Sequence, residues 1–215
     1  AGMSSRMGSF KPMLNIGSIS IAQRIVATFR QAGVDRIVMI TGYNATELEK
    51  HLSNNGIVFL RNEDYETTQM FDSVKIGLEY LRNKCDRILF TPVDIPLFTS
   101  ATVTALRDID GELACPSCDG ETGHPIMLAS SLIDKILSDS GRGGLKGALD
   151  RCGTEMHYVS VPDRGILHDA DSPEDYQMLL KYHNRQLVRQ VVSVSLAREK
   201  VFFDDRTAML LRLVD

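Results

Sequence analysis

Short, solidly apolar runs alternate along this chain with longer stretches in which apolar residues recur every three or four positions. The short runs have the length of β-strands, and the longer stretches have the spacing of amphipathic helices, so the pattern predicts βαβ units. Because the strands are apolar throughout, both faces of the sheet should be covered, which favours mostly parallel strands in a three-layer α/β sandwich. The expected strands are 36–40, 57–60, 87–93 and 125–129, and the expected helices are 19–31, 68–81, 99–106 and 172–182.

The composition limits the classes of partner. The 215 residues carry a formal net charge of -4, so no overall basic field would gather a nucleic acid or an anionic membrane. No run approaches the roughly 20 apolar residues that span a bilayer, and no secretory leader is recognisable. The four cysteines are too few and too irregularly spaced for a secreted disulfide framework. We expect one main domain in a cytoplasmic protein, with any phosphate bound by a local site.

The first twelve residues, AGMSSRMGSFKP, combine small residues with two cations. Gly2 allows the backbone to approach a ligand closely, Ser4 and Ser5 add hydrogen-bond donors, and Arg6 and Lys11 can neutralise phosphate oxygens. The spacing is neither that of a Walker loop nor that of a dinucleotide fold. On composition, the segment is either a phosphate-binding loop or a solvated chain end.

Two acidic segments are candidates for a metal site. In TPVDIPL, Asp94 follows an apolar strand, where a carboxylate would lie at the ligand-binding edge of an α/β sheet. The alternative is that Asp94 caps the helix that follows Pro96. In HDADSPEDY, either Asp171 or Ser172 is placed to cap the next helix, so Asp169 is the better metal candidate. Mg²⁺ suits such a site because it binds one or two carboxylates together with substrate phosphates.

A competing site is Cys115-Pro116-Ser117-Cys118, because CxxC spacing occurs in redox and metal-binding motifs. No second CxxC is present in the sequence. A structural zinc site would therefore need two more ligands from distant cysteines or histidines.

The opening segment closely resembles the signature LAAGxSxRMGxxK of the MobA-like nucleotidyltransferases, which include molybdenum-cofactor cytidylyl- and guanylyltransferases. The resemblance covers most of residues 1–183 and implies a Rossmann-like, GT-A-like fold. It implies that the loop starting at Ala1 and Gly2 wraps the NTP phosphates, while Arg6 and Lys11 stabilise charge as pyrophosphate leaves. It also implies that Asp94 binds the catalytic metal.

Two further segments resemble parts of the same family. NEDYETTQMFDSVKIGL corresponds to the stretch whose serine, here Ser73, lies near the base and ribose, although Gln69 replaces the usual glycine. TGHPIML corresponds to a segment that lines the acceptor pocket and implies that Gly123, His124 and Pro125 contact the pterin. The alternative for His124 is an ordinary surface-loop histidine, and no acid-base role is expected of it.

The resemblance implies transfer of CMP from CTP to molybdenum-bound molybdopterin, with Mg²⁺ as cofactor and a client molybdoenzyme as a partner. The family distinguishes bases at the loop start, where LAAG marks the cytidylyl form, and Ala1 directly before Gly2 fits it. Guanylyl transfer, or transfer to a sugar phosphate, remains the alternative.

The last residues resemble a different module. SLAREKVFFDDRTAMLLRLVD is similar to the start of the winged helix-turn-helix of ModE-like molybdate regulators. We therefore expect a nucleotidyltransferase domain over 1–183, then a connector and a partial helix-turn-helix over 184–215, with DNA binding only if that module is completed. We also expect that a first strand lies upstream of Ala1. The tail raises a second class of function, a nucleotide or cofactor sensor attached to a DNA-binding module.

Overall fold

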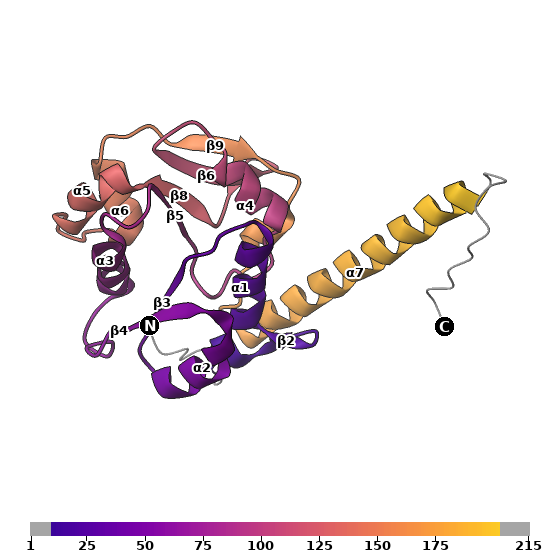
Figure 1. Cartoon of the computed structure of the whole chain (residues 1–215), viewed down its shortest axis with the longest axis horizontal. Helices are drawn as coiled ribbons and strands as arrows, with labels where there is room; N and C mark the ends of the chain where they lie inside the picture. Colours follow the sequence, from indigo (N-terminus) through magenta and orange to yellow (C-terminus); the bar gives the residue numbers. More distant parts are fainter. Residues whose placement is uncertain (1–9, 203–215) are drawn as a thin grey trace.

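The structure is a computed structural model that describes the backbone of residues 10–202 and the side chains of residues 10–188. Figure 1 shows a layered α/β body from which the long C-terminal helix projects. The strands are β1 (Asn15–Ile16), β2 (Ile19–Ser20), β3 (Ile37–Thr41), β4 (Ile57–Arg61), β5 (Arg87–Phe90), β6 (Leu113–Cys118), β7 (Glu121–Thr122), β8 (Ile126–Ala129) and β9 (His157–Ser160). The helices are α1 (Ile21–Gln31), α2 (Ala45–His51), α3 (Met70–Leu81), α4 (Ser100–Arg107), α5 (Ile133–Leu137), α6 (Gly144–Arg151) and α7 (Pro173–Phe202), with short 3₁₀ turns η1 (Lys11–Met13), η2 (Ser53–Asn55), η3 (Ser130–Leu132) and η4 (Arg164–Leu167).

The strands form a mixed arrangement. β3 and β4 pair in parallel, while a second sheet has the order β5-β8-β6-β7 with β9 parallel to β6. β8 runs antiparallel to both β5 and β6. The predicted α/β fold with a mixed sheet is confirmed, and its antiparallel pairings lie around β8 and β7. A strand in the middle of a mixed sheet is covered on both faces whichever way it runs, so an apolar run does not reveal its direction.

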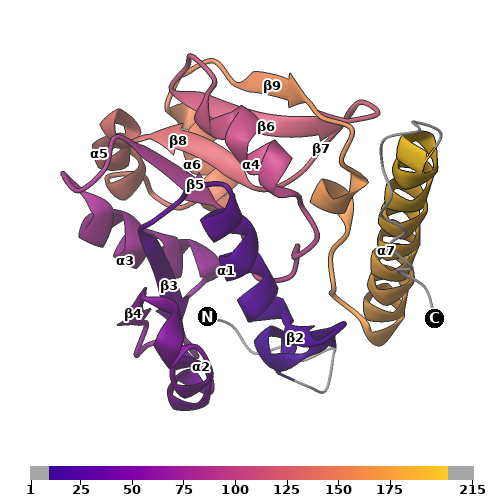
Figure 2. The same ribbon diagram turned by 45° about the vertical axis from the view of Figure 1, so that its right-hand side comes forward.

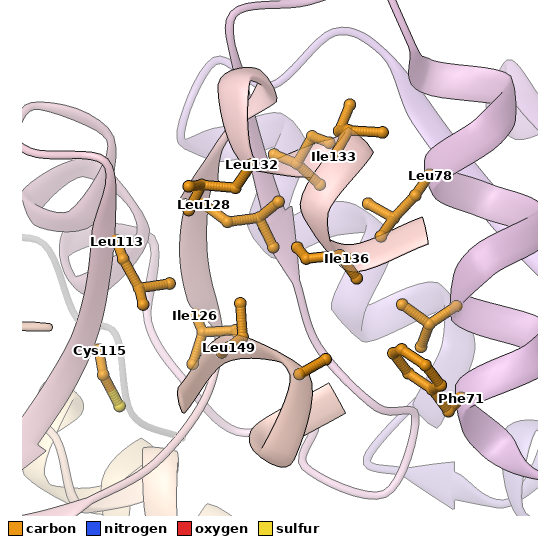
Figure 3. Close-up of a cluster of buried hydrophobic side chains, with 13 residues drawn as sticks. Phe71, Leu78, Leu113, Cys115, Ile126, Leu128, Leu132, Ile133, Ile136 and Leu149 are labelled. Atoms are coloured by element: carbon orange, nitrogen blue, oxygen red, sulfur yellow. The ribbon is translucent and has the colours of Figure 1, made fainter. Parts of the chain in front are cut away.

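Helices cover both faces of the sheet, which confirms the three layers. On one face, α3, α5 and α6 pack against alternate residues of β5, β6 and β8, and Figure 3 shows this core. On the other face, α1, α4 and the start of α7 pack against a second buried cluster. In Figure 2, α4 lies in front of β6 and β8, and α1 lies beside α4. Neighbouring strand residues divide between the two faces: Ile88 belongs to the first core, and Leu89 packs against the second.

Helix starts follow local capping chemistry. Ser20 caps α1 through a reciprocal capping box with Gln23. Ser172 caps α7, because the Asp175 amide donates to Ser172 Oγ at 3.1 Å while Asp175 accepts from the Ser172 amide at 2.9 Å. Such signals are local in sequence, which is why the starts of the predicted helices agree with the structure to within about two residues.

α7 is longer than predicted. It continues past residue 182 to Phe202, across the expected domain boundary after His183. Its first turns pack against the body through Tyr176, Leu179 and Leu180, and the remainder projects from the body in Figure 1. The predicted connector is therefore helical, as are the first residues, 195–202, of the segment that resembles a helix-turn-helix, and the rest of that segment lies outside the described residues. The domain boundary remains a prediction.

Within residues 10–202, no helix has both the length and the apolar character that a membrane span requires.

A buried carboxylate joins the segments that carry the site. Asp163 is 6% exposed, and its Oδ2 accepts from the Thr99 amide at 2.7 Å and from the hydroxyls of Thr99 and Thr102 at 2.9 and 2.6 Å. Its Oδ1 accepts from the Gly165 amide at 3.0 Å. A Cβ on Gly165 would lie 2.0 Å from the carbonyl oxygen of Leu97, so only glycine fits this close approach. The loop that precedes η4 is thus held against the loop that follows β5.

We expect Asp163→Ala to lower the free energy of unfolding by about 3 kcal/mol, because it leaves several buried donors without an acceptor. Urea unfolding measures this change. Asp119→Asn is the control, since the ion pair of Asp119 with Arg164 is exposed and Asn tolerates the left-handed backbone there, so this change should alter stability by less than about 0.5 kcal/mol. Equal effects of the two variants would contradict the role given to Asp163.

Candidate active site

Asp94 lies in the turn directly after β5, at the carboxyl end of that strand. α4 is capped by Thr99, whose hydroxyl accepts from the Thr102 amide at 3.3 Å. The alternative that Asp94 is a helix cap is therefore wrong. Among the side chains of residues 10–188, none hydrogen-bonds to the buried Oδ1 atom of Asp94. A buried carboxylate oxygen without a partner is costly, which makes it a candidate ligand for a cation.

Lys11 reaches the same place from the other end of the chain. Its Nζ lies 2.7 Å from Asp171 Oδ1, with the Lys11 side chain 12% exposed and the Asp171 side chain 49% exposed. The ion pair joins the end of the opening loop to the segment that precedes α7. The sequence offered no sign of this pairing.

Four charged groups influence one another at this site. Burial raises the pKa of the Asp94 carboxyl, Lys11 lowers it, and the negative charges of Asp171 and, more weakly, Asp169 raise it. Burial also raises the pKa of Asp169, and Asp171 and Asp175 add to that effect while Lys11 opposes it. The structure therefore brings the predicted residues Lys11, Asp94 and Asp169 into one electrostatic cluster, together with Asp171.

The two acids of HDADSPEDY have different surroundings. The helix cap is Ser172, so the sequence alternative in which Asp171 caps α7 is wrong. Asp171 is instead bound to Lys11, and it affects Asp94 more strongly than Asp169 does. Sequence reasoning identified both acids and Lys11, but it did not predict the ion pair that joins Lys11 to Asp171.

The donor set fits a hard divalent cation. Asp94 offers a buried oxygen without a partner, and Asp169 and Asp171 supply carboxylates nearby. Over the described part of the chain, no group of three or more His, Cys, Asp or Glu side chains is close enough to bind a metal alone. Mg²⁺ needs only one or two carboxylates when substrate phosphates complete its coordination, so these residues fit it.

His124 is not an ordinary surface histidine. Its Nδ1 atom is buried and lacks a hydrogen-bond partner among the described residues, and its ring lies 6.0 Å from that of Phe90 at the end of β5. Burial lowers the pKa of His124, and the Phe90 carbonyl opposes that effect. Burial therefore favours the neutral imidazole, whose buried Nδ1 offers a polar atom for a ligand.

Gly123 and Pro125 flank His124 and are held in place with it. The His124 amide donates to the carbonyl of Ile166 in η4 at 3.2 Å. A Cβ on Gly123 would lie 2.1 Å from the same carbonyl oxygen, so this position requires glycine. The predicted acceptor segment is thus packed against η4, which Asp163 holds in turn.

Ser73 is turned inward. It is 5% exposed, lies in the first turn of α3, and accepts a hydrogen bond from Asn62 Nδ2 at 3.0 Å. Asn62 also donates to Thr68 Oγ1 at 2.9 Å and accepts from the Asp64 amide at 3.1 Å. The structure thus gives Ser73 a part in holding the loop after β4, and a direct contact with a nucleotide remains a prediction. Sequence reasoning missed Asn62, although it begins the segment that was singled out.

Part of the predicted loop lies outside the part of the chain that the structure describes. The members with proposed roles that lie outside the described residues are Ala1, Gly2, Ser4, Ser5 and Arg6. Their roles remain predictions that rest on the sequence, and Lys11 is the loop residue whose contacts are known.

The CxxC motif is not a joint site. Cys115 and Cys118 both lie in β6, and they pack into the cores on opposite faces of the sheet. Side chains three residues apart on a strand point to opposite faces, so the two thiols cannot share an ion or a disulfide, and both are free.

Comparison with curated proteins gives relatives at moderate identity. Molybdenum cofactor cytidylyltransferase of Escherichia coli strain K12 is 27% identical over 180 residues, 82% of this chain and 90% of that protein. Phosphoenolpyruvate guanylyltransferase of Rubrobacter xylanophilus is 27% identical over 186 residues, 83% of this chain and 87% of that protein.

Solved structures share the fold. A nucleotidyl transferase from Methanothermobacter thermautotrophicus superposes with a TM-score of 0.75 at 22% identity, over 86% of this chain and 95% of that one. Rv0371c from Mycobacterium tuberculosis H37Rv, in complex with manganese, superposes with a TM-score of 0.69 at 19% identity, over 81% and 94% of the two chains.

Residues 1–157 match the family of the MobA-like NTP transferase domain, which is well over half of the chain. The chain therefore belongs to the MobA-like NTP transferases, and it is a nucleotidyltransferase.

Proposed function

We propose that this nucleotidyltransferase moves CMP from CTP to molybdenum-bound molybdopterin and releases pyrophosphate. The observation that carries the proposal is the cluster in which Lys11 is paired with Asp171 beside the unpartnered buried oxygen of Asp94. A cation beside a hard-metal donor set is suited to a triphosphate and the metal that accompanies it. The cytidylyltransferase relative supports this choice of base and acceptor.

In this reaction, a terminal phosphate oxygen of the acceptor attacks the α-phosphorus of CTP in line. A bond forms between that oxygen and the α-phosphorus, the bond to the bridging oxygen of the β-phosphate breaks, and pyrophosphate leaves. The protein supplies no nucleophile of its own. Lys11, and by proposal Arg6, stabilise charge on the phosphates, so that catalysis comes from position and electrostatics.

We propose Asp94 and Asp169 as the residues that hold a divalent cation, with Mg²⁺ as the cofactor. The carboxylate donor set supports this, as does the manganese complex of the Mycobacterium tuberculosis structure. Asp171 already has a cationic partner in Lys11, which favours Asp169 for the metal. When bound, the cation would neutralise phosphate charge as a Lewis acid.

On the acceptor side, we propose that Gly123, His124 and Pro125 line the pterin pocket. The buried, partner-free Nδ1 of His124 supports a polar contact with the ligand there. The phosphoenolpyruvate guanylyltransferase relative, at the same identity, favours guanylyl transfer as the second candidate reaction.

Pyrophosphate release tests the proposed function. With Mg²⁺ and the molybdopterin acceptor, turnover should be highest with CTP among the four NTPs, and Asp94→Ala should reduce it at least 1,000-fold because a metal ligand is lost. Fastest turnover with GTP would favour the guanylyl alternative. A protein that binds nucleotide without turnover would be a sensor, which would contradict the proposal.

Asp94→Asn should separate activity from stability. The raised pKa means that the carboxyl holds its proton more tightly in the folded protein, so stability falls as the pH rises through the folded-state pKa. At pH 7, the neutral Asn should therefore raise the melting temperature by a few °C, on the order of the shift expected for about 1 kcal/mol, while abolishing turnover.

That gain should disappear below about pH 3.9, the ordinary pKa of Asp, because both side chains are then neutral. Thermal unfolding across pH measures it, with the exposed Asp86→Asn as the control. A lower melting temperature for Asp94→Asn at pH 7 would contradict this prediction, because it would show that the charged Asp94 carboxylate stabilises the folded protein.

The two acids before α7 should differ in what they affect. Asp169→Asn should raise the Mg²⁺ concentration for half-maximal rate about 10-fold or more, since a ligand is lost. Asp171→Asn should instead raise KM for CTP with little change in the Mg²⁺ requirement. The substitution removes the ion pair that holds the Lys11 ammonium group in position for the triphosphate. The reverse pattern would assign the metal to Asp171.

A further inference from the structure

Three aromatic rings form a continuous row beside the proposed phosphate site. The ring centroids of Phe10 and Tyr43 are 5.9 Å apart, those of Tyr43 and Tyr65 are 6.4 Å apart, and both pairs meet edge to face. We call these three residues the aromatic edge. Phe10 is also the chain neighbour of Lys11, so the row starts where the predicted phosphate loop ends.

The aromatic edge lies where α/β proteins bind ligands. Tyr43 follows the end of β3 and Tyr65 follows the end of β4, and these strands are parallel. Ligands of such sheets bind outside the carboxyl ends of the strands. A cavity of about 560 Å³ opens at these strand ends, lined by Tyr65 and by Gly42 and Asn44, the chain neighbours of Tyr43, although not by Tyr43 itself. Its size falls within the range of small-molecule sites.

The middle ring of the row is anchored but open. Phe10 packs against the small core formed by Ala22, Leu48 and Leu52, which fixes one end of the row. Tyr43 is 39% exposed although it is a large aromatic residue. An exposed ring held by neighbouring rings can stack a planar ligand without losing much conformational freedom.

We propose that Tyr43 is a nucleotide-binding residue of the transfer reaction, on whose ring the nucleobase of the NTP stacks, with Tyr65 closing the far side of the base site. This rests on the proposed function for the identity of the NTP. The acceptor segment Gly123–Pro125 is packed against η4, whereas the aromatic edge belongs to β3, β4 and the chain before Lys11. Lys11, the proposed phosphate ligand, directly follows Phe10 in the chain, so we assign the aromatic side to the base and not to the pterin.

Calorimetry with the full chain tests the stacking without relying on turnover. Tyr43→Ala should weaken CTP binding about 5- to 100-fold, the effect typical of one lost base–aromatic stack. Inorganic tripolyphosphate, which has no base, should bind both proteins equally. Tyr43→Phe should keep affinity within about three-fold because the ring remains. Tyr158→Ala, which removes an exposed tyrosine from β9, should change nothing.

Steady-state kinetics then separates the two substrates. Tyr43→Ala should raise KM for CTP with kcat changed less than about two-fold, and leave KM for the acceptor unchanged. Unaltered CTP affinity, equal loss of CTP and tripolyphosphate affinity, or a rise confined to the acceptor KM would each overturn the inference. If GTP proves to be the substrate, the same loss should appear with GTP, so a wrong base would contradict the proposed function and leave the role of Tyr43 standing.

Discussion

The hydrogen bonds to Asp163 hold together the segments on which the site depends. One carboxylate accepts from the start of α4 and from the first residues of η4, so the loop after β5 and the strand-to-helix segment after β9 cannot move independently. η4 in turn touches Gly123, and the chain beyond it leads directly to Asp169. Both carboxylate oxygens of Asp163 thus accept hydrogen bonds. Asp94, the proposed metal ligand, has a buried oxygen that accepts none from the described residues.

That contrast has a physical reason. Asp163 is buried with four donors around it, and hydrogen bonds of this kind offset the loss of hydration. Asp94 has a buried oxygen without such compensation, and its pKa rises as a result. A carboxylate oxygen that is positioned to bind a cation is buried without a hydrogen bond when the cation is absent. A protein donor bonded to that oxygen would compensate for its lost hydration, but it would also compete with the cation.

The sequence predicted the parts of the site whose signals are local. Asp94 stood at the end of an apolar run, and the cap at Ser172 is a three-residue pattern. β6 escaped prediction because Pro116 stands inside it, and proline normally argues against a central strand. The pairing of Lys11 with Asp171 spans 160 positions, and no local pattern encodes such a contact. Tyr43 escaped for the same reason, since its importance lies in its two aromatic neighbours and not in its own segment.

The charge balance of the cluster explains why a nucleotide and a cation belong together there. Among the described residues, the carboxyls of Asp94, Asp169 and Asp171 face the single ammonium of Lys11. Three acids with one base repel a bare triphosphate, and in a chain of net charge -4 no long-range field compensates. A triphosphate that arrives with a divalent cation brings the missing positive charge to the carboxyls. Lys11 can then interact with the phosphate oxygens of the nucleotide. Stacking of the base on Tyr43 adds to the affinity for the nucleotide independently of these charges, because the ring and the base are both neutral.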